Sequence, residues 1–374
     1  VRDIITMGRL LAHLGAIVET PEIPPTAMKI QTDEINGAEA PYELVRTMRA
    51  SILTLGPLVA RSGHARVSLP GGCAIGARPV DLHLAGLEKM GARIRISEGY
   101  VEAEAARLHG AKVLLDFPSV GATQQLMMAA ALADGTTTIE NAAREPENVC
   151  LGALLKSMGA DIRGVGTSEI VIEGRPELGG GEQAVIPDRI EAGTYMVAAA
   201  ITGGSVRITG ARSDHLEAFI AKLRESKVTV VEGESGLRVE ANGKLAAVDV
   251  TTMVHPGFPT DLQAQFMALM TRATGASTFR ETVFENRLQH TQELARMGAK
   301  IHIQGNQATV HGPTVLSGAP VMATDLRASM CLVLAGLAAR GTTTITRVYH
   351  LDRGYERVEE KLGALGADVR REAA

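Results

Sequence analysis

Residues Gly135–Gly164 read GTTTIENAAREPENVCLGALLKSMGADIRG, and this stretch decides the fold. The β-branched run Thr136–Glu140 predicts a strand. Pro146–Met158 predicts a helix that ends at Gly159, because a chain leaving a helix for a strand needs a residue that tolerates positive φ. Ile162–Gly164 then predicts the first strand of a hairpin. Short strands alternating with helices indicate an α/β fold.

The flanking sequence completes a unit around this stretch. Val113–Asp116 predicts a leading strand, Thr123–Ala133 an Ala- and Met-rich helix, and Glu169–Glu173 the second strand of the hairpin. The unit is therefore β-α-β-α-β-β. Similar strand sequences at Gly204–Thr209 and Gly341–Thr346 predict further copies of it.

A short phrase repeats along the whole chain: Gly-Ala, one variable residue, then Ile or Val, with a strand expected to follow. It begins at Gly15, Gly91, Gly159, Gly298 and Gly366, and a degenerate copy is expected at Ser226-Lys227-Val228-Thr229. The copies lie about 70 residues apart, which predicts six α/β units and about 420 residues. The chain has 374 residues, so the first unit is expected to lack its leading strand, first helix and second strand.

Two domains are expected, residues 1–186 and 187–374. The boundary is placed near Ile186-Pro187, after the hairpin of the third unit and the turn at Gly179-Gly180-Gly181.

Composition excludes several classes of protein. Hydrophobic residues make up 45% and charged residues 21% of the chain, which is enough for a large core. Lys and Arg number 38 against 42 Asp and Glu, and aromatic residues make up only 3%, so neither a basic surface nor a base-stacking platform for nucleic acid is expected. No apolar run approaches the roughly 18 residues of a membrane span. Three cysteines are too few for a disulfide framework and indicate a reduced, cytosolic protein.

The segment Ser68–Asp81, SLPGGCAIGARPVD, predicts a surface loop around Cys73. One interpretation is a turn that happens to contain a cysteine. The other is an accessible thiol five residues from Arg78, whose guanidinium favours the thiolate or lets the thiol act as a proton donor.

Several arginines stand in uncharged, turn-rich sequence. They are Arg49, Arg78, Arg287, Arg327 and Arg353. Each alone could be a solvated surface charge, but together they predict a substrate with several negative charges. Arg327 follows a predicted strand at the start of a helix, where free backbone N–H groups also favour anions. Neither a Walker-type loop nor a dinucleotide fingerprint is present.

Asp261, in the segment His255–Phe266, has two interpretations. It is either a carboxylate that stabilises the start of a helix or a general base at the opening of a site. The ten histidines form no His-x-x-x-His pair, and no Cys-x-x-Cys pair occurs, so neither a metal nor a cofactor is expected.

Taken together, these segments resemble one family, the UDP-N-acetylglucosamine 1-carboxyvinyltransferases (enolpyruvyl transferases). The similar segments are Pro41–Ser51 (PYELVRTMRAS), Ser68–His83 (SLPGGCAIGARPVDLH), Gly135–Glu147 (GTTTIENAAREPE), Ile186–Thr194 (IPDRIEAGT), Pro256–Phe266 (PGFPTDLQAQF), Val283–Arg287 (VFENR), Met322–Ser329 (MATDLRAS) and Tyr349–Glu356 (YHLDRGYE). The resemblance implies a two-domain inside-out α/β barrel with three β-α-β-α-β-β units per domain, the first unit being incomplete here.

The resemblance also implies an activity and a set of site residues. The enolpyruvyl group of phosphoenolpyruvate would be transferred to the 3′-hydroxyl of UDP-N-acetylglucosamine, with release of phosphate, for peptidoglycan synthesis. Cys73 matches the general acid and the target of fosfomycin, and Asp261 matches the base for the sugar hydroxyl. Arg78, Arg327 and Arg353 match the arginines that hold phosphoenolpyruvate. Positions that match nucleotide-sugar contacts are Arg49, Arg78, Pro79, Val80, Asp81, Leu82, Ser119, Val120, Gly121 and Val283, while Arg287 and Asp325 match further active-site positions.

The sequence departs from the family pattern near its N-terminus. A Lys-Asn pair that contacts phosphoenolpyruvate in the family has no counterpart, so this chain is expected to bind the nucleotide sugar but to turn over poorly. Phe117 replaces a Lys that some members carry. Two alternatives stay open: a shikimate 3-phosphate enolpyruvyl transferase, which shares the fold and the donor, and a UDP-N-acetylglucosamine-binding chain with impaired catalysis. The protein is expected to be a monomer that binds neither nucleic acid nor membrane.

Overall fold

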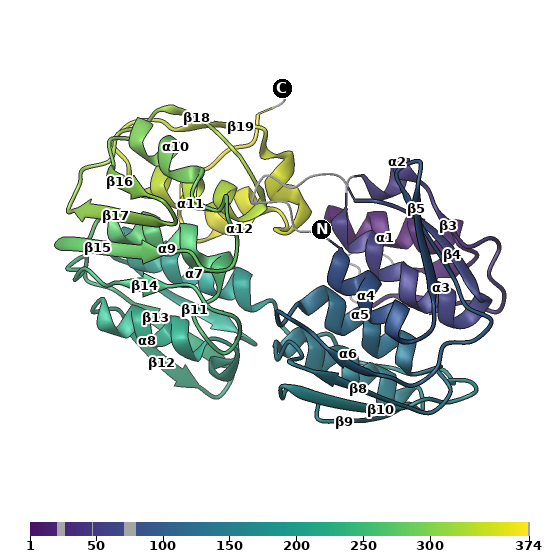
Figure 1. Cartoon of the computed structure of the whole chain (residues 1–374). Coiled ribbons are helices and arrows are strands. Elements are labelled where there is room, and N and C mark those ends of the chain that lie inside the picture. The colour runs from purple at the N-terminus through teal and green to yellow at the C-terminus, as the bar shows by residue number, and fades with distance from the viewer. Residues whose placement is uncertain (21–26, 47, 71–79, 373–374) are drawn as a thin grey trace. The chain divides into compact units, whose positions relative to one another are not determined.

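The computed structural model describes residues 1–20, 27–46, 48–70 and 80–372, which divide into two compact units (Figure 1). Pro187–Ala374 belong to the C-terminal unit, and most of the preceding residues form the N-terminal unit.

The N-terminal unit contains three sets of strands and the helices that pack on them. Its helices are α1 (Arg2–His13), α2 (Tyr42–Val45), η1 (Arg49–Thr54), α3 (Leu55–Ser62), α4 (Asp81–Lys89), α5 (Val120–Ala130) and α6 (Pro146–Ser157). Its strands are β1 (Ile17–Glu19), β2 (Lys29–Gln31), β3 (Glu39–Ala40), β4 (His64–Ser68), β5 (Arg93–Ser97), β6 (Tyr100–Glu104), β7 (Lys112–Leu114), β8 (Thr136–Glu140), β9 (Asp161–Arg163) and β10 (Glu169–Glu173).

The C-terminal unit repeats this arrangement. Its helices are α7 (Arg189–Thr202), η2 (Ser213–His215), α8 (Glu217–Glu225), η3 (Thr260–Leu262), α9 (Gln263–Met270), α10 (His290–Arg296), α11 (Leu326–Ala338), η4 (Val348–Arg353) and α12 (Val358–Ala364). Its strands are β11 (Ser205–Thr209), β12 (Thr229–Gly233), β13 (Gly236–Glu240), β14 (Val250–Thr251), β15 (Gly275–Arg280), β16 (Lys300–Gln304), β17 (Gln307–Gly312), β18 (Pro320–Met322) and β19 (Thr344–Thr346).

Three four-stranded sheets share one topology: β3-β4-β6-β5, β7-β8-β10-β9 and β14-β15-β17-β16. In the second of these, β7 is parallel to β8, with Val113 opposite Ile139, so α5 forms the crossover between them. β10 pairs antiparallel with both β8 and β9, and Ile172 lies opposite Ile162 in the hairpin. These three sheets confirm the predicted β-α-β-α-β-β unit.

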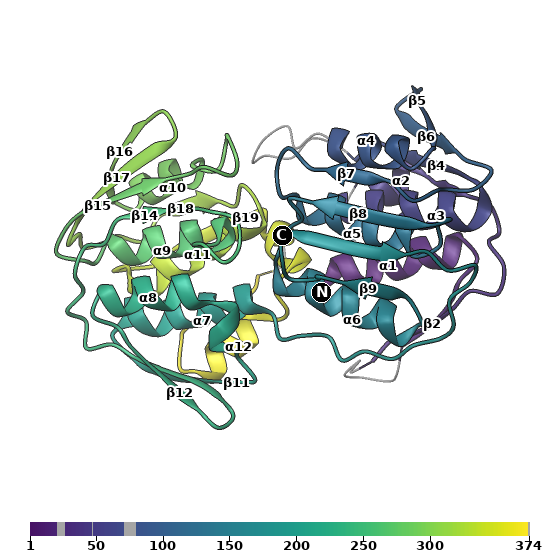
Figure 2. The same cartoon turned by 60° about the horizontal axis from the view of Figure 1, so that its bottom comes forward.

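The helices form the inside of each unit and the sheets form the outside. In the C-terminal unit α7, α9 and α11 pack against one another, and every residue of α9 is buried (Figure 1). Six of its eight residues are apolar, as expected for a helix that is enclosed on every side. The strands instead bury alternate residues, as in β8, and β8 packs against α5 (Figure 2). This arrangement leaves the helix ends, rather than their sides, available for a site.

The repeated Gly-Ala phrase is a helix cap. Its five glycines have φ between 93° and 104°, as predicted, and in each copy the next residue donates its N–H to a leucine carbonyl five residues earlier, for example Ala160 to Leu155 at 2.9 Å. The degenerate copy was expected one residue too early. Lys227 has φ 69°, and Val228 donates to Leu223, so Lys227 rather than Ser226 takes the place of the glycine.

Three other expectations are wrong. α5 begins at Val120 instead of Thr123 because Ser119 Oγ accepts from the N–H of Ala122 and caps the helix. The unit that contains α7 has no leading strand, because residues 174–188 include two prolines and three consecutive glycines and form no ladder. No strand follows Gly366 in the described residues, because residues 367–372 pair with no other strand.

Candidate active site

An acidic side chain lies between two arginines in the C-terminal unit. Asp261 is in η3, and Arg287 Nη2 donates to its Oδ1 at 2.6 Å. Arg327 Nε lies 3.5 Å from its Oδ2. The side chains of Arg287 and Arg327 are only 5% and 15% exposed, whereas that of Asp261 is 38% exposed. Two largely buried cations therefore hold the carboxylate, while part of its surface stays exposed.

Local sequence explains why these groups meet. Pro259 has an extended backbone and η3 begins directly after it, so Asp261 stands at the entrance to α9. Asp325 caps α11, its Oδ1 accepting from the backbone N–H groups of Arg327 and Ala328 at 2.9 and 3.0 Å. This cap fixes the helix start that carries Arg327. α9 and α11 pack against each other, which brings their first turns together.

The two guanidinium groups control the charge of the carboxylate. Burial by itself would raise the pKa of Asp261, but the positive charges of Arg287, Arg327 and Arg189 outweigh it and hold this pKa well below its ordinary value. Asp261 is consequently ionised at every pH near neutrality.

Arg327 has capacity for a further ligand. Its guanidinium carbon lies 5.3 Å from the ring centroid of Tyr355. Its Nε and Nη1 are buried, and neither makes a hydrogen bond with the described residues. Buried donors of this kind require an acceptor, and a phosphate or carboxylate oxygen is the acceptor that suits a guanidinium.

A buried network of uncharged groups supports this region from below. The hydroxyl of Tyr355, a residue only 2% exposed, lies 2.9 Å from Thr194 Oγ1 and accepts from Gln265 Nε2 at 3.3 Å. Gln265 Nε2 also donates to the backbone oxygen of Asp261 at 2.9 Å. The network thus connects α7, η3 and the segment after η4. Sequence reasoning missed these residues although they lie in the segments quoted above, because a buried Tyr or Gln carries no motif of its own.

A buried histidine completes the surroundings of the ion pairs. His290, at the start of α10, is 1% exposed. Burial lowers its pKa to about 4, although the charge of Asp325 opposes the shift. The imidazole is therefore neutral at pH 7 and adds no positive charge to the two arginines.

Other predicted residues gather in the N-terminal unit. Val80 and Asp81 stand at the start of α4, followed by Leu82, and Ser119 caps α5, which begins with Val120 and Gly121. The two helix starts are adjacent, because a methyl group on Gly121 would lie 3.0 Å from Cε1 of His83. Arg49 begins η1, which packs against α5. These positions share one end of the helices in this unit.

The predicted residues thus fall into separate groups. Asp261, Arg287, Asp325 and Arg327 are brought together, and Val283 lies on the loop that leads to Arg287. Arg353 ends η4, which packs on α11. Cys73, Arg78 and Pro79 lie outside the described residues.

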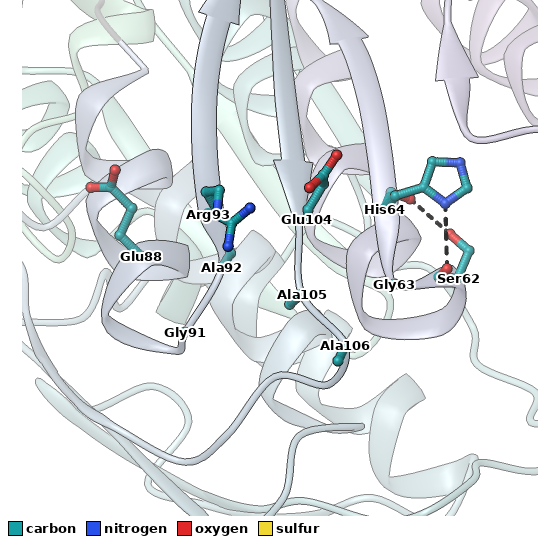
Figure 3. A pocket seen from close by; sticks show the side chains of 10 residues that line it. All are labelled: Ser62, Gly63, His64, Glu88, Gly91, Ala92, Arg93, Glu104, Ala105 and Ala106. Carbon is teal, nitrogen blue, oxygen red and sulfur yellow. Dashed lines mark hydrogen bonds between the residues drawn. The ribbon is translucent and has the colours of Figure 1, made fainter.

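A hollow of about 700 Å³ in the N-terminal unit is separate from the predicted site residues of the described ranges (Figure 3). It is lined by Ser62, Gly63, His64, Glu88, Gly91, Ala92, Arg93, Glu104, Ala105 and Ala106. Glu88 lies in the last turn of α4, at the opposite end from Asp81. Its charged side chains have both signs, and no predicted site residue of the described ranges lines it.

Within the described ranges, His, Cys, Asp and Glu side chains nowhere gather in threes as a metal site would need. Of the helices described, none combines the length and apolar character of a membrane span.

Comparison with known proteins identifies the family. The family profile described as EPSP synthase (3-phosphoshikimate 1-carboxyvinyltransferase) matches residues 1–362. A UDP-N-acetylglucosamine 1-carboxyvinyltransferase of Magnetococcus marinus is 57% identical over 371 residues, covering 99% of this chain and 88% of the relative. The chain belongs to the UDP-N-acetylglucosamine 1-carboxyvinyltransferase family. A second member, from Solidesulfovibrio magneticus, is 60% identical over 333 residues, which are 89% of this chain and 80% of the relative.

Solved structures agree with the family's fold. The enolpyruvyl transferase NikO from Streptomyces tendae superposes with a TM-score of 0.89 at 29% identity, covering 98% of this chain and 87% of that one. EPSP synthase from Acinetobacter baumannii has the same fold, with a TM-score of 0.73 at 20% identity over 97% of this chain and 87% of that one. The predicted α/β fold of the enolpyruvyl transferase type is confirmed.

Proposed function

We propose that this chain transfers the enolpyruvyl group of phosphoenolpyruvate to the 3′-hydroxyl of UDP-N-acetylglucosamine and releases phosphate, a step of peptidoglycan synthesis. The observation that carries the proposal is the pair formed by Asp261 and Arg327. A carboxylate that can accept a proton lies 3.5 Å from a buried guanidinium with two N–H groups unbonded in the described chain. A base and an anion holder side by side suit the addition of a hydroxyl group to a phosphorylated enol.

Asp261 is the base in this proposal. Its low pKa makes it a weak base, so it cannot deprotonate a free alcohol. Once C3 of phosphoenolpyruvate is protonated, however, C2 becomes strongly electrophilic, and the sugar hydroxyl becomes acidic as its oxygen bonds to C2. The proton then passes to Asp261 while the C–O bond forms. Elimination breaks the bond between C2 and the phosphate oxygen, and C3 returns a proton to the group that supplied it, which restores the enol ether.

The arginines hold the donor. Arg327 offers the N–H groups that make no hydrogen bond with the described residues to the phosphate or carboxylate of phosphoenolpyruvate, and Arg353 contributes a second cation from η4. Arg287 holds Asp261 in place through the 2.6 Å contact, and Asp325 holds the start of α11. Because these groups are fixed before the reaction, they need little reorganisation during it.

The remaining expected residues supply the acid and bind the sugar nucleotide. Cys73 is proposed to protonate C3, with Arg78 near it in sequence holding the donor. Arg49, the run Pro79, Val80, Asp81 and Leu82, the turn Ser119, Val120 and Gly121, and Val283 are proposed to contact UDP-N-acetylglucosamine. No cofactor or metal takes part in this proposal.

The acceptor separates this proposal from its nearest alternative. Relatives named for UDP-N-acetylglucosamine are 57% identical over almost the whole chain, whereas a solved EPSP synthase is 20% identical. Phosphate release with phosphoenolpyruvate and each acceptor tests the choice. Release with UDP-N-acetylglucosamine supports it, and release only with shikimate 3-phosphate contradicts it. Calorimetric binding of UDP-N-acetylglucosamine without any release indicates the binding chain instead.

The role of Cys73 has its own test. Fosfomycin is expected to form one covalent adduct, on the peptide that contains Cys73, and Cys73→Ser is expected to form none. Cys331 is fully buried, and burial raises the pKa of its thiol, so it serves as an internal unreactive control. An adduct that persists in the Cys73→Ser variant would show that another group reacts.

A further inference from the structure

Glu281 is a buried carboxylate that sequence analysis did not single out. It directly follows β15, is 3% exposed, and accepts four hydrogen bonds. Its Oε1 accepts from Thr252 Oγ1 at 2.9 Å and from the backbone N–H groups of Val283 and Phe284 at 2.9 and 3.2 Å. Its Oε2 accepts from Thr260 Oγ1 at 2.9 Å. All four donors are uncharged.

These donors belong to segments that carry the proposed site. Thr260 immediately precedes Asp261 in η3, and Val283 begins the loop that leads to Arg287. Thr252 follows β14 and also accepts from the N–H of Thr282 at 2.9 Å. One carboxylate therefore joins the turn with the proposed base to the loop with its arginine partner.

The backbone of Glu281 adds a further anchor. Its N–H donates to the carbonyl of Asn306 at 2.9 Å, and Asn306 Nδ2 donates to its carbonyl at 2.9 Å. Asn306 lies in the turn between β16 and β17. The residue is thus fixed to the sheet through its main chain while its side chain reaches the two loops.

We propose that Glu281 is a positioning residue that sets the distance between Asp261 and Arg287. The proposal rests on the proposed function, because it concerns the placement of the base and of its partner. Burial of a carboxylate among uncharged donors is costly. Four hydrogen bonds from two loops and a strand end offset that cost and give one rigid junction.

The division of donors between the two oxygens makes the proposal testable. Oε1 receives three donors, whereas Oε2 receives only a hydroxyl, which can equally accept. Glutamine at this position can place its oxygen at Oε1 and its amide at Oε2, donating to Thr260. Glu281→Gln is therefore expected to stay close to wild type in kcat and in KM. Glu281→Ala removes the whole junction and is expected to lower kcat and raise the KM for UDP-N-acetylglucosamine.

Thr260 isolates the connection to the base. Thr260→Val removes only the hydrogen bond to Oε2 and leaves the Val283 and Phe284 contacts in place. We expect kcat to fall about ten- to a hundredfold, the cost of a small misplacement of a reacting group, with little change in the KM for UDP-N-acetylglucosamine. Thr260→Ser keeps the hydroxyl and is expected to restore wild-type kcat. In the Glu281→Ala background, Thr260→Val is expected to add little, since the two residues share one interaction.

Two readouts distinguish positioning from simple stabilisation. The low pKa of Asp261 depends on its distance to Arg287, Arg327 and Arg189, so in Thr260→Val the acidic limb of kcat against pH is expected to move to higher pH. Unchanged kcat and an unchanged limb in Thr260→Val would overturn the proposal, as would a Glu281→Gln variant as impaired as Glu281→Ala. A Glu281→Ala variant that does not fold leaves the Thr260 series to decide.

Hydrogen exchange separates failure of this inference from failure of the proposed function. The amides of Val283 and Phe284 are expected to exchange slowly in wild type and in Glu281→Gln, and quickly in Glu281→Ala. If wild type transfers nothing to UDP-N-acetylglucosamine, the proposed function fails while exchange still tests the junction. Fast exchange of both amides in wild type would show that the junction does not form.

Discussion

Arg287 Nη2 lies 2.6 Å from Oδ1 of Asp261, and the guanidinium is buried where the carboxylate is partly exposed. Because of this difference in burial, the two residues have different roles. The arginine is enclosed and cannot reorient easily, so it determines where the carboxylate points. The carboxylate keeps one side open and can therefore meet a hydroxyl group. An ion pair of two fully exposed residues would fix neither position.

Replacing Asp261 with asparagine tests its role as the base. The side chain keeps its shape and its contact to Arg287 but cannot take a proton at neutral pH. We expect kcat to fall by about 10²- to 10⁴-fold, the usual contribution of a general base, and binding of UDP-N-acetylglucosamine to change little. Steady-state phosphate release and calorimetry measure the two quantities. Asp368→Asn, at a side chain that is 85% exposed, is the control. A kcat within threefold of wild type would remove Asp261 from this role.

Replacing Arg287 with methionine changes the pH dependence of the site. Burial raises the pKa of Asp261, and without Arg287 fewer positive charges oppose that rise. We therefore expect the acidic limb of kcat to move to higher pH. Arg296→Met, at an exposed surface arginine, should leave the limb where it is. Activity measured between pH 4 and pH 8 decides, and identical limbs in the two variants would contradict the assigned coupling.

The lowered pKa of Asp261 also affects the unfolding free energy. The folded-state pKa of Asp261 lies below the ordinary unfolded value of about 3.9. Ionised Asp261 thus stabilises the fold fully above that unfolded value, and the contribution is lost as the pH falls through the folded pKa. Asp261→Asn is expected to flatten the pH dependence of the unfolding free energy below about pH 4. Urea titrations at several acidic pH values measure this, and parallel curves for the two proteins would count against it.

Replacing Tyr355 with phenylalanine tests the network beneath the site. Loss of the hydroxyl leaves Gln265 and Thr194 with an unsatisfied contact in a buried place. We expect a loss of about 1–3 kcal/mol in unfolding free energy, the cost of buried polar groups left without a partner. Tyr349→Phe, at a side chain that is 46% exposed, is the matched control. Equal stability of the two variants would show that the hydroxyl contributes nothing.

Replacing Lys227 with glycine tests the helix caps. Lys227 has φ 69°, a conformation that costs a residue with a side chain about 1–2 kcal/mol and glycine almost nothing. After the greater entropy loss of glycine is subtracted, we expect about 0.5–1 kcal/mol of added stability. Gly159→Ala is the reverse change at φ 99°, where no atom crowds the new methyl group, and should destabilise. Urea unfolding measures both variants, and destabilisation by Lys227→Gly would refute the comparison.

The β-α-β-α-β-β unit and its helix caps could be predicted from the sequence, because both depend on local chemistry. Gly159 needs positive φ wherever the helix packs, and the run Thr136–Glu140 forms β8 with the predicted bounds. The sequence did not predict features whose position depends on a neighbouring residue. Lys227 tolerates positive φ without being glycine, so the repeat was placed one residue early. The start of α5 depends on a cap by Ser119, which the apolar pattern does not reveal.

In the candidate site, too, some residues could be predicted from the sequence and others could not. Asp261 and Arg327 stood out because a carboxylate and an arginine at helix starts have recognisable chemistry. Glu281, Tyr355 and Gln265 did not, because their importance comes from what they contact across α7, η3 and β15, and those contacts exist only after folding. Residues that touch a substrate leave a trace in motifs. The residues that hold them in place leave very little.

Nε and Nη1 of Arg327 make no hydrogen bond with the described part of the chain, and they link the affinity of the protein for anions to its melting temperature. An anion that accepts from these donors binds the folded chain and not the unfolded one, so it must raise the midpoint of unfolding by mass action. The increment grows with the logarithm of anion concentration once the site is saturated. Inorganic phosphate, the product of the proposed reaction, is therefore expected to protect the protein against heat more than chloride at equal ionic strength. The difference in melting temperature between phosphate and chloride therefore measures anion binding at Arg327.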